Sequence, residues 1–190
     1  MVSYAQPEAP TLPAPVGLDA EIQRLQLLLA AELSWLQVSY GKAYRGSRKA
    51  PGGKVQYFPE VYAGKREYRD VLPNDNVAAQ SFFYPTGPQA NPNREPLPGT
   101  LSLQQPVDLI VWGNLEAIDP TKTWRYEAEL VVDVVRVLNE DGRARIVRVV
   151  TQAEEVFRGF SPELLPAHQL RQPWAGFRVQ MELNVGNVLC

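Results

Sequence analysis

The segment that most constrains this fold is residues 177–185, near the end of the chain, where apolar and polar residues alternate without interruption. Side chains on a strand point to opposite faces in turn, so the alternation predicts a strand with one buried face and one solvated face. The apolar set is Phe177, Val179, Met181, Leu183 and Val185, and the polar set is Arg178, Gln180, Glu182 and Asn184. Such a strand needs a sheet of earlier segments beside it.

A helix is predicted over residues 19–38, ahead of the first strand. Asp19 is a suitable N-terminal cap, and Gly41 is a plausible stop just beyond the end of the helix. Apolar residues recur there at helical spacing and form one stripe, made of Ile22, Leu25, Leu29, Leu33 and Leu36. A broad stripe of this kind favours a helix that packs on a sheet.

The next part of the chain is rich in basic residues and turn signals. Residues 42–54 are basic and contain Gly46, Gly52 and Gly53, but their spacing matches no phosphate-binding loop, so we interpret them as a solvated loop. Residues 55–62 have strand character, and Pro59 within them indicates an edge strand or a bulge. We expect turn structure over residues 67–75. A short strand is expected over residues 81–84, whose sequence is Ser-Phe-Phe-Tyr.

Two longer apolar segments follow. In residues 107–118 and 124–138 alternate positions are mainly apolar, as in strands with one core face. The short turn between the two segments predicts an antiparallel hairpin. Residues 143–158 are ambiguous, because they could pair back as another strand, but Ile146, Val149 and Val150 follow helical spacing. We favour a helix for this segment.

Together these elements predict an α+β fold with a mainly antiparallel sheet and with the N-terminal helix and a second helix packed on one face. We expect a single domain over residues 18–190. Residues 1–17, which are rich in proline, predict an extended N-terminal arm, and residues 85–106 predict a projecting Pro-rich loop. Long aperiodic segments inside a domain are normally disordered or functional, so residues 1–17 and residues 85–106 could each become ordered on a partner.

Composition limits the classes of function. The 190 residues are 45% hydrophobic and carry a net charge of −2, so no overall field draws the chain to nucleic acid or acidic lipid. No apolar run approaches the roughly 18 residues of a membrane span, and we expect neither a membrane partner nor a secretory signal. Cys190 is the only cysteine, which excludes an intrachain disulfide and fits a reducing cytoplasm.

Residues suited to catalysis are sparse. His168 is the only histidine, and no Gly-x-Ser-x-Gly elbow supplies a nucleophile for it. Glu127 and Glu129 would share a strand face about 7 Å apart, but nothing apolar closes around them to raise a carboxyl pKa. We therefore predict no enzymatic activity, no catalytic residue, no metal site and no cofactor.

The order of elements resembles the tail terminator, or head–tail joining, proteins of tailed bacteriophages. The resemblance covers about residues 18–40 and 107–185. Its strongest part is residues 171–183, Arg-Gln-Pro-Trp-Ala-Gly-Phe-Arg-Val-Gln-Met-Glu-Leu, together with Glu-Val-Phe-Arg at 155–158. The Pro-rich start and the 85–106 loop exceed the compact family pattern.

The resemblance implies a structural virion protein of the tail or neck that is assembled in the host cytoplasm. Its subunits would form a ring, in that family a hexamer, that caps the tail tube and joins a neck protein while genomic DNA passes through the lumen. We expect Glu127, Glu129 and Asp133 to face that lumen or a seam between subunits. The full set of candidate lumen or interface residues adds Trp112, Trp124, Arg178 and Glu182 to these three.

Three other classes stay open from the sequence. One is a different neck or connector protein, and another is a monomeric α+β module that presents the 107–138 hairpin to a small ligand or peptide. The third is a small hydrolase that uses His168 or the acidic residues at 127 and 129.

Overall fold

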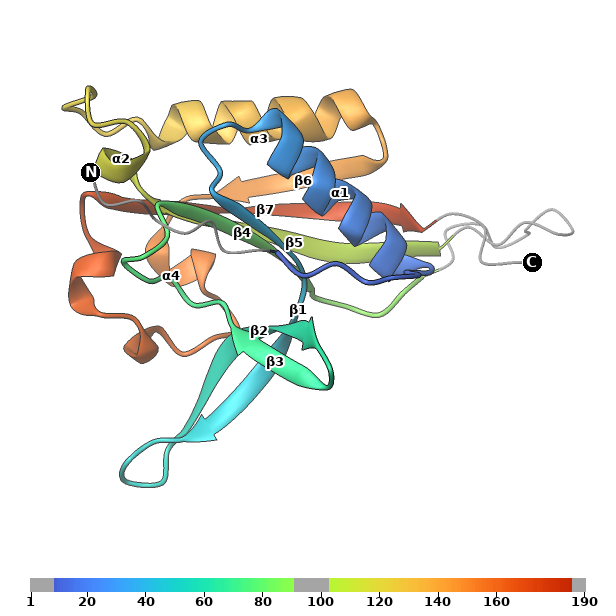
Figure 1. Ribbon diagram of the computed structural model, residues 1–190, viewed down its shortest axis with the longest axis horizontal. Coiled ribbons are helices and arrows are strands. Elements are labelled where there is room, and N and C mark those ends of the chain that lie inside the picture. Colours follow the sequence, from blue (N-terminus) through green and yellow to red (C-terminus); the bar gives the residue numbers. More distant parts are fainter. Residues whose placement is uncertain (1–8, 91–102, 186–190) are drawn as a thin grey trace, which may run out of the picture.

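The computed structural model describes residues 9–90 and 103–185, which form a seven-stranded sheet with helices on both faces (Figure 1). The strand order is β3-β2-β1-β4-β5-β7-β6, and neighbouring strands are antiparallel except β1 and β4, which are parallel. The strands are β1 (Val38–Lys49), β2 (Val55–Gly64), β3 (Glu67–Asp70), β4 (Ala79–Pro85), β5 (Leu103–Asn114), β6 (Ala144–Val150) and β7 (Trp174–Val185). The predicted α+β class with a mainly antiparallel sheet is confirmed.

Strand β7 is the closing strand predicted from the alternation, and it lies between β5 and β6. Its pairing with β5 is unbroken from Leu103↔Val185 to Asn114↔Trp174. The five apolar residues of the predicted core face are each at most 2% exposed. That half of the prediction is confirmed, because a long strand buried on one face has no freedom to slip by one residue.

Two helices cover the core face, α1 (Leu18–Glu32) and α3 (Glu127–Asp141), and Figure 1 shows them side by side above the sheet. Their buried residues join the apolar side of β7 in one cluster, which includes Ile22, Leu25, Leu29, Leu130, Val134 and Leu138. The predicted arrangement, an N-terminal helix and a second helix on one face, is therefore confirmed. The second helix, however, comes from a different part of the chain than predicted.

The strand predicted over residues 124–138 is wrong, because most of this segment lies in α3. The hairpin with residues 107–118 therefore does not exist, and β5 ends at Asn114 before the short helix α2 (Leu115–Ile118). The buried residues of α3 are Leu130, Val134, Val137 and Leu138, which lie on one helical stripe. Five valines lie close to Asp133 in the sequence, and they make alternate positions apolar, which is also the pattern of a strand.

The helix predicted over residues 143–158 is also wrong, because residues 144–150 form β6 and only Ala153–Val156 are helical, as α4. The pairing of β6 with β7 shifts between Ile146 and Arg148. This bulge leaves Val147 as an extra residue, so Ile146 and Val149 lie on the same face although they are three residues apart. A bulged strand thus reproduced the spacing of a helix.

Helix α1 ends at Glu32, earlier than the predicted 38, and Gly41 lies inside β1 instead of stopping a helix. A side chain at position 41 would place its Cβ 2.8 Å from Oε1 of Gln26, so glycine lets α1 approach the strand closely. The solvated loop predicted over residues 42–54 is wrong as well. Most of it is β1, and residues 50–54 form the turn into β2.

Pro59 does not mark an edge, because β2 pairs with β1 on one side and with β3 on the other. The carbonyl of Pro59 accepts a hydrogen bond of 3.0 Å from the amide of Val71, just beyond the end of β3. The missing N–H of the proline therefore faces the place where pairing with β3 stops. Residues 67–70, predicted as a turn, form the actual edge strand.

The two Pro-rich segments are only partly within the described residues. Of the predicted arm 1–17, residues 9–17 run beside α1, where the amide of Leu12 donates to Oε1 of Gln23 at 2.5 Å. Of the predicted loop 85–106, Pro85 belongs to β4, residues 103–106 belong to β5, and Ala90 bridges to Gln104. Residues 1–8 and 91–102, about half of each predicted segment, lie outside the described residues.

Gly142 ends α3 in the left-handed conformation, with φ of 70°. Because a Cβ strains this conformation, we expect Gly142→Ala to lower the free energy of unfolding by about 1 kcal/mol, measured by urea denaturation. Asparagine tolerates the left-handed region, so Gly142→Asn should lose clearly less. Equal stability of the alanine variant and the wild type would contradict this assignment of the helix end.

Candidate functional site

The three acidic residues predicted to face a lumen or a seam all lie on α3, where they do not form one strip. Glu127 pairs with Arg125 and Glu129 pairs with Lys122, while Asp133 accepts a hydrogen bond of 3.1 Å from Nε1 of Trp35. Residues two apart on a helix project in different directions, so Glu127 and Glu129 do not share a face. The paired carboxylates that the hydrolase hypothesis needs are therefore not brought together.

Trp112 and Arg178, two further candidates, lie on the second face of the sheet and are buried. This face is covered by α4, by a turn of 3-10 helix at Pro162–Leu164 and by another, η2, at Ala167–Leu170 (Figure 1). The predicted solvated face of β7 is therefore wrong at Arg178, whose side chain is 3% exposed. Neither residue is placed to meet a lumen or another subunit directly.

Arg178 is the centre of a buried polar cluster. Its Nη1 donates to Oδ2 of Asp108 at 3.0 Å, and its Nε and Nη2 donate to the carbonyls of Val156 and Arg158 at 2.9 and 2.7 Å. Burial raises the pKa of the Asp108 carboxyl, and the charge of Arg178 opposes this rise without cancelling it. The cluster fastens the end of α4 to the middle of the sheet.

The remaining two candidates, Trp124 and Glu182, are both closer to solvent. Trp124 lies in the loop before α3 and is 57% exposed. Glu182 accepts hydrogen bonds of 3.0 and 2.8 Å from Arg145 across the β6–β7 pair. Of the seven candidates, Trp124 and Glu129 are thus the ones most available to a partner.

His168, on η2, has an exposed side chain whose Nε2 lies 3.0 Å from Oδ1 of Asp75. The hydrogen bonds from His168 and Gln169 lower the pKa of Asp75. Among the described residues, no group of three or more His, Cys, Asp or Glu side chains is placed to hold a metal ion. The contact fastens η2 to the loop before β4, which is a structural role.

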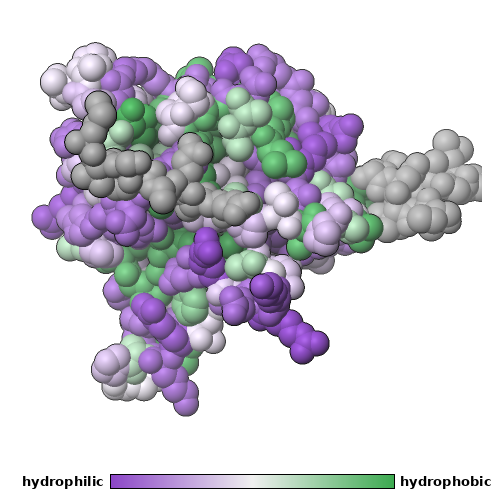
Figure 2. All heavy atoms as spheres, viewed as in Figure 1, coloured by the Kyte–Doolittle hydropathy of each residue, from purple (hydrophilic) through white to green (hydrophobic). Residues whose placement is uncertain are grey.

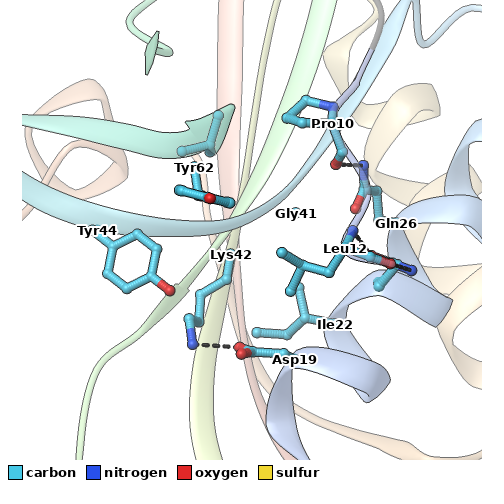
Figure 3. Close-up of a pocket in the computed structure, with 11 residues that line it drawn as sticks. Pro10, Leu12, Asp19, Ile22, Gln26, Gly41, Lys42, Tyr44 and Tyr62 are labelled. Carbon is cyan, nitrogen blue, oxygen red and sulfur yellow. Dashed lines mark hydrogen bonds and ion pairs between the residues drawn. The ribbon is translucent and has the colours of Figure 1, made fainter. Parts of the chain in front are cut away.

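A small cavity lies between the N-terminal segment, α1, the first half of β1 and the end of β2 (Figure 3). Its volume is about 120 Å³, well below the roughly 300 Å³ at which ligand pockets begin. Figure 3 shows Lys42 directed at Asp19 on one wall, with Pro10 and Leu12 held against α1 on the other. Burial lowers the pKa of Lys42, but the hydrogen bonds to Asp19 and Tyr44 raise it above its ordinary value. We interpret the cavity as the place where residues 10–12 pack against α1.

The hairpin of β1 and β2 extends beyond the rest of the sheet, at the bottom of Figure 1. Pairing of β1 with β4 ends at Lys42, and pairing of β2 with β3 ends at Glu60, so residues 45–49 and 55–59 pair only with each other. We call residues 43–59 the arm. Within the described residues, the backbone of the arm is bonded to other parts of the chain at Pro59, which accepts from Val71, and at Tyr57. The N–H and carbonyl of Tyr57 bond to Oγ and N–H of Ser161 at 3.0 and 2.8 Å.

The arm and its base carry aromatic rings and cations. Tyr44 and Tyr62 each pack edge-on against Tyr68, with centroids 5.7 and 5.6 Å apart. The guanidinium of Arg45 lies 3.7 Å from the ring centroid of Tyr57, and that of Arg48 lies 5.6 Å from that of Phe58. This cluster was not predicted from the sequence, where its signal is the period of two that places Tyr44, Gly46 and Arg48 on one face of a strand.

The outer side of α1 is unusually apolar for an exposed helix. Leu27 is 53% exposed, and no charged residue occurs between Arg24 and Glu32. On the neighbouring helix α3, Val132 is 64% exposed. Figure 2 shows hydrophobic atoms gathered over α1, whereas the arm at the bottom of the view is mainly hydrophilic. Exposed apolar surface of this kind is typical of a contact with another protein.

Comparison with known proteins finds no matching family model, no matching curated relative and no matching solved structure. Within residues 9–90 and 103–185, no helix combines the length and the apolar character needed to cross a membrane.

Proposed function

We propose that this protein is a structural virion protein that assembles into a ring, terminates the tail tube of a bacteriophage and joins it to the neck. The observation that carries the proposal is the uncharged outer side of α1, where Leu27, Ala30 and Ala31 face solvent in the single chain. Leu27 and Ala31 are four residues apart, so they form a stripe along the helix. Burying such a stripe against a neighbour removes apolar area from water.

The distribution of charge is compatible with DNA passing through such a ring. Residues 42–70 contain eight Lys or Arg and three Asp or Glu residues, a net charge of +5. Because the whole chain carries −2, the other residues carry −7. Each fixed cation in a lumen would add a phosphate contact and hold the DNA, so an acidic body lets it slide.

The proposal predicts a defined oligomer that depends on the apolar side of α1. Native mass spectrometry of the wild type should show a ring, with six subunits as the expected number. Leu27→Glu would place a charge in the subunit contact and should weaken assembly by at least about tenfold, equivalent to about 1.4 kcal/mol.

Leu170→Glu is the matched control, because Leu170 is 38% exposed on η2, on the opposite face of the sheet. It should leave the ring intact. Negative-stain images of the wild type mixed with tail tubes should then show rings at tube ends. A wild type that stays monomeric at the highest attainable concentration, with no decoration of tubes, would overturn the proposal.

A further inference from the structure

The arm and the most acidic helix lie at opposite edges of the sheet. The arm belongs to β1 and β2, whereas α3 packs on β6 and β7, which end the strand order on the other side. Figure 1 shows the arm at the bottom of the molecule and α3 at the top. The arm therefore cannot reach α3 of its own chain, but it can reach α3 of a second copy.

The two surfaces carry opposite charge. Helix α3 contains five Asp or Glu residues and one Arg, a net charge of −4. On the arm, Arg45 and Lys49 lie on one face and Arg48 on the other, so both faces are basic. All three side chains are exposed, and none is in an ion pair with another described residue. Complementary patches of this kind steer association and fix its register.

The chemistry of the two surfaces also matches beyond charge. The outer side of α3 presents Glu129, Val132 and Glu140, with side chains of both carboxylates more than half exposed and Val132 between them. Their present partners, Lys122 and Arg136, form surface ion pairs, which contribute little and can be exchanged. The arm offers the guanidinium groups of Arg45 and Arg48 beside the rings of Tyr57 and Phe58, which suits a surface of carboxylates around an aliphatic side chain.

The arm itself has the character of a segment that needs a partner. A two-stranded ribbon is marginally stable in water, and beyond its own pairing the described backbone supports the arm only at Ser161 and, at its base, at Val71. The edge of β1 beyond Lys42 has no neighbouring strand in the described part of the chain. A second protein surface over the arm would remove this exposure.

A nucleic acid is the other acidic partner to consider, and the observations favour it less. Tyr44 and Tyr68 pack against each other, centroids 5.7 Å apart and planes at 89°, instead of presenting parallel ring faces on which bases could stack. Glu60, Glu67 and Asp70 interrupt the basic surface at the base of the arm. A continuous basic groove, which a phosphate backbone requires, is therefore missing from the described residues of this hairpin.

We infer that the arm of each subunit docks on the outer side of α3 of the next subunit. The inference rests on the proposed ring and names the contact that closes it. A donor surface at one edge and an acceptor at the other give a head-to-tail interface, and such interfaces form closed rings when the rotation between subunits allows it.

Charge reversal with exchange of partners tests this contact. Arg48→Glu/Lys49→Glu reverses the arm, and Glu129→Lys/Glu140→Lys reverses the outer side of α3. Each double variant alone should assemble at least about tenfold more weakly than the wild type at the same salt concentration. All four residues are on the surface, and thermal unfolding should show that both variants remain folded.

An equimolar mixture of the two variants should restore rings. In the mixture, the acidic arm of one variant meets the basic α3 of the other, and the unchanged arm meets the unchanged α3. The rings should therefore alternate and contain an even number of subunits, which native mass spectrometry reads directly if one variant is isotope-labelled.

The outcomes separate the inference from the proposed function. If Arg48→Glu/Lys49→Glu assembles into rings as tightly as the wild type, or if the mixture does not recover rings, the docking of the arm is overturned. The proposed ring would not be affected by either result. A monomeric wild type would overturn both. A fluorescein-labelled DNA duplex that binds the wild type but not the arm variant, with rings unaffected, would assign the arm to nucleic acid instead.

Discussion

Arg178→Met should lower the free energy of unfolding by about 3–5 kcal/mol, the cost of leaving one buried charge without its partner. The side chain of Asp108 is 5% exposed. Among the described residues, its salt-bridge partner is Arg178, with Nη1 3.0 Å from Oδ2 of Asp108. The substitution also removes two donors to the carbonyls of Val156 and Arg158. Urea denaturation followed by tryptophan fluorescence measures the change, because Trp112 and Trp174 lie in the hydrophobic cluster that contains Val156.

Two control variants identify the cause of this loss. Arg145→Met removes an arginine from the exposed pair with Glu182, where Arg145 is 72% exposed, and should change stability by less than about 0.5 kcal/mol. The double variant Arg178→Met/Asp108→Leu removes both buried charges and should recover part of the loss. A double variant less stable than Arg178→Met would show that Asp108 is not the uncompensated group.

The same variant should have a characteristic pH dependence. Burial raises the pKa of Asp108 above its ordinary value of 3.8, and without Arg178 this pKa should rise further. A carboxyl with a raised folded pKa binds more protons in the folded state, so stability falls as the pH rises through that pKa. The loss caused by Arg178→Met should therefore be smaller at about pH 4 than at about pH 7.

The sequence predicted best those elements whose pattern has one cause. The alternation of β7 reflects one buried face along an unbroken pairing with β5, so its core residues could be named in advance. The stripe of α1 likewise reflects contact with a single sheet face. The parallel pairing of β1 with β4 could not be predicted, because it depends on contacts between segments about 40 residues apart that local patterns do not record.

The errors arose where two patterns fit one segment. In α3, the valines fit both a period of 2 and a period of 3.6. The segment is a helix because Leu130, Val134 and Leu138 can then be buried on one stripe. In β6, the bulge at Val147 changed the period within a single strand. Since Glu127, Glu129 and Asp133 were placed on that supposed strand, their shared acidic face disappeared with it.

Candidate site residues were the hardest to predict, because their burial depends on what covers them. Arg178 has the sequence position of a solvated residue, and only the packing of α4 on that face encloses it. The arm shows the reverse case. Its glycines and cations are typical of a loop, but Gly46 leaves room for the ring of Phe58 and the carboxylate of Glu60, both 2.8 Å from where a Cβ would lie.

Gly176→Ala should destabilise the protein by about 3 kcal/mol, the upper end of the usual cost of overpacking a core. A Cβ at position 176 would lie 1.6 Å from Cε3 of Trp112 and 2.3 Å from Cζ3, so the indole ring occupies its place. Trp112 has no room to withdraw, because it is 3% exposed and packs edge-on against Phe157 at 4.8 Å. The two residues are direct partners on β5 and β7, so any shift strains the centre of the sheet.

Gly41→Ala is the matched control for this substitution, since both glycines lie within strands and both would place a Cβ in close contact. At position 41 the contact is 2.8 Å from Oε1 of Gln26, the far end of a buried but flexible side chain. Its rotation costs at most the hydrogen bond to Pro10, so the loss should stay below about 1.5 kcal/mol. At position 176 the contact is with a rigid ring. Trp112→Leu should cost about 3 kcal/mol alone, through the cavity that it leaves.

In the double variant Gly176→Ala/Trp112→Leu the new methyl group enters space that the indole has vacated. The combined loss should therefore be at least about 1 kcal/mol smaller than the sum of the two single losses, which denaturant unfolding of all four proteins measures. Strict additivity would mean that the indole does not lie on Gly176. The packing of α4 and Phe157 on the second face would then need a different explanation, because this contact places Trp112 beneath them.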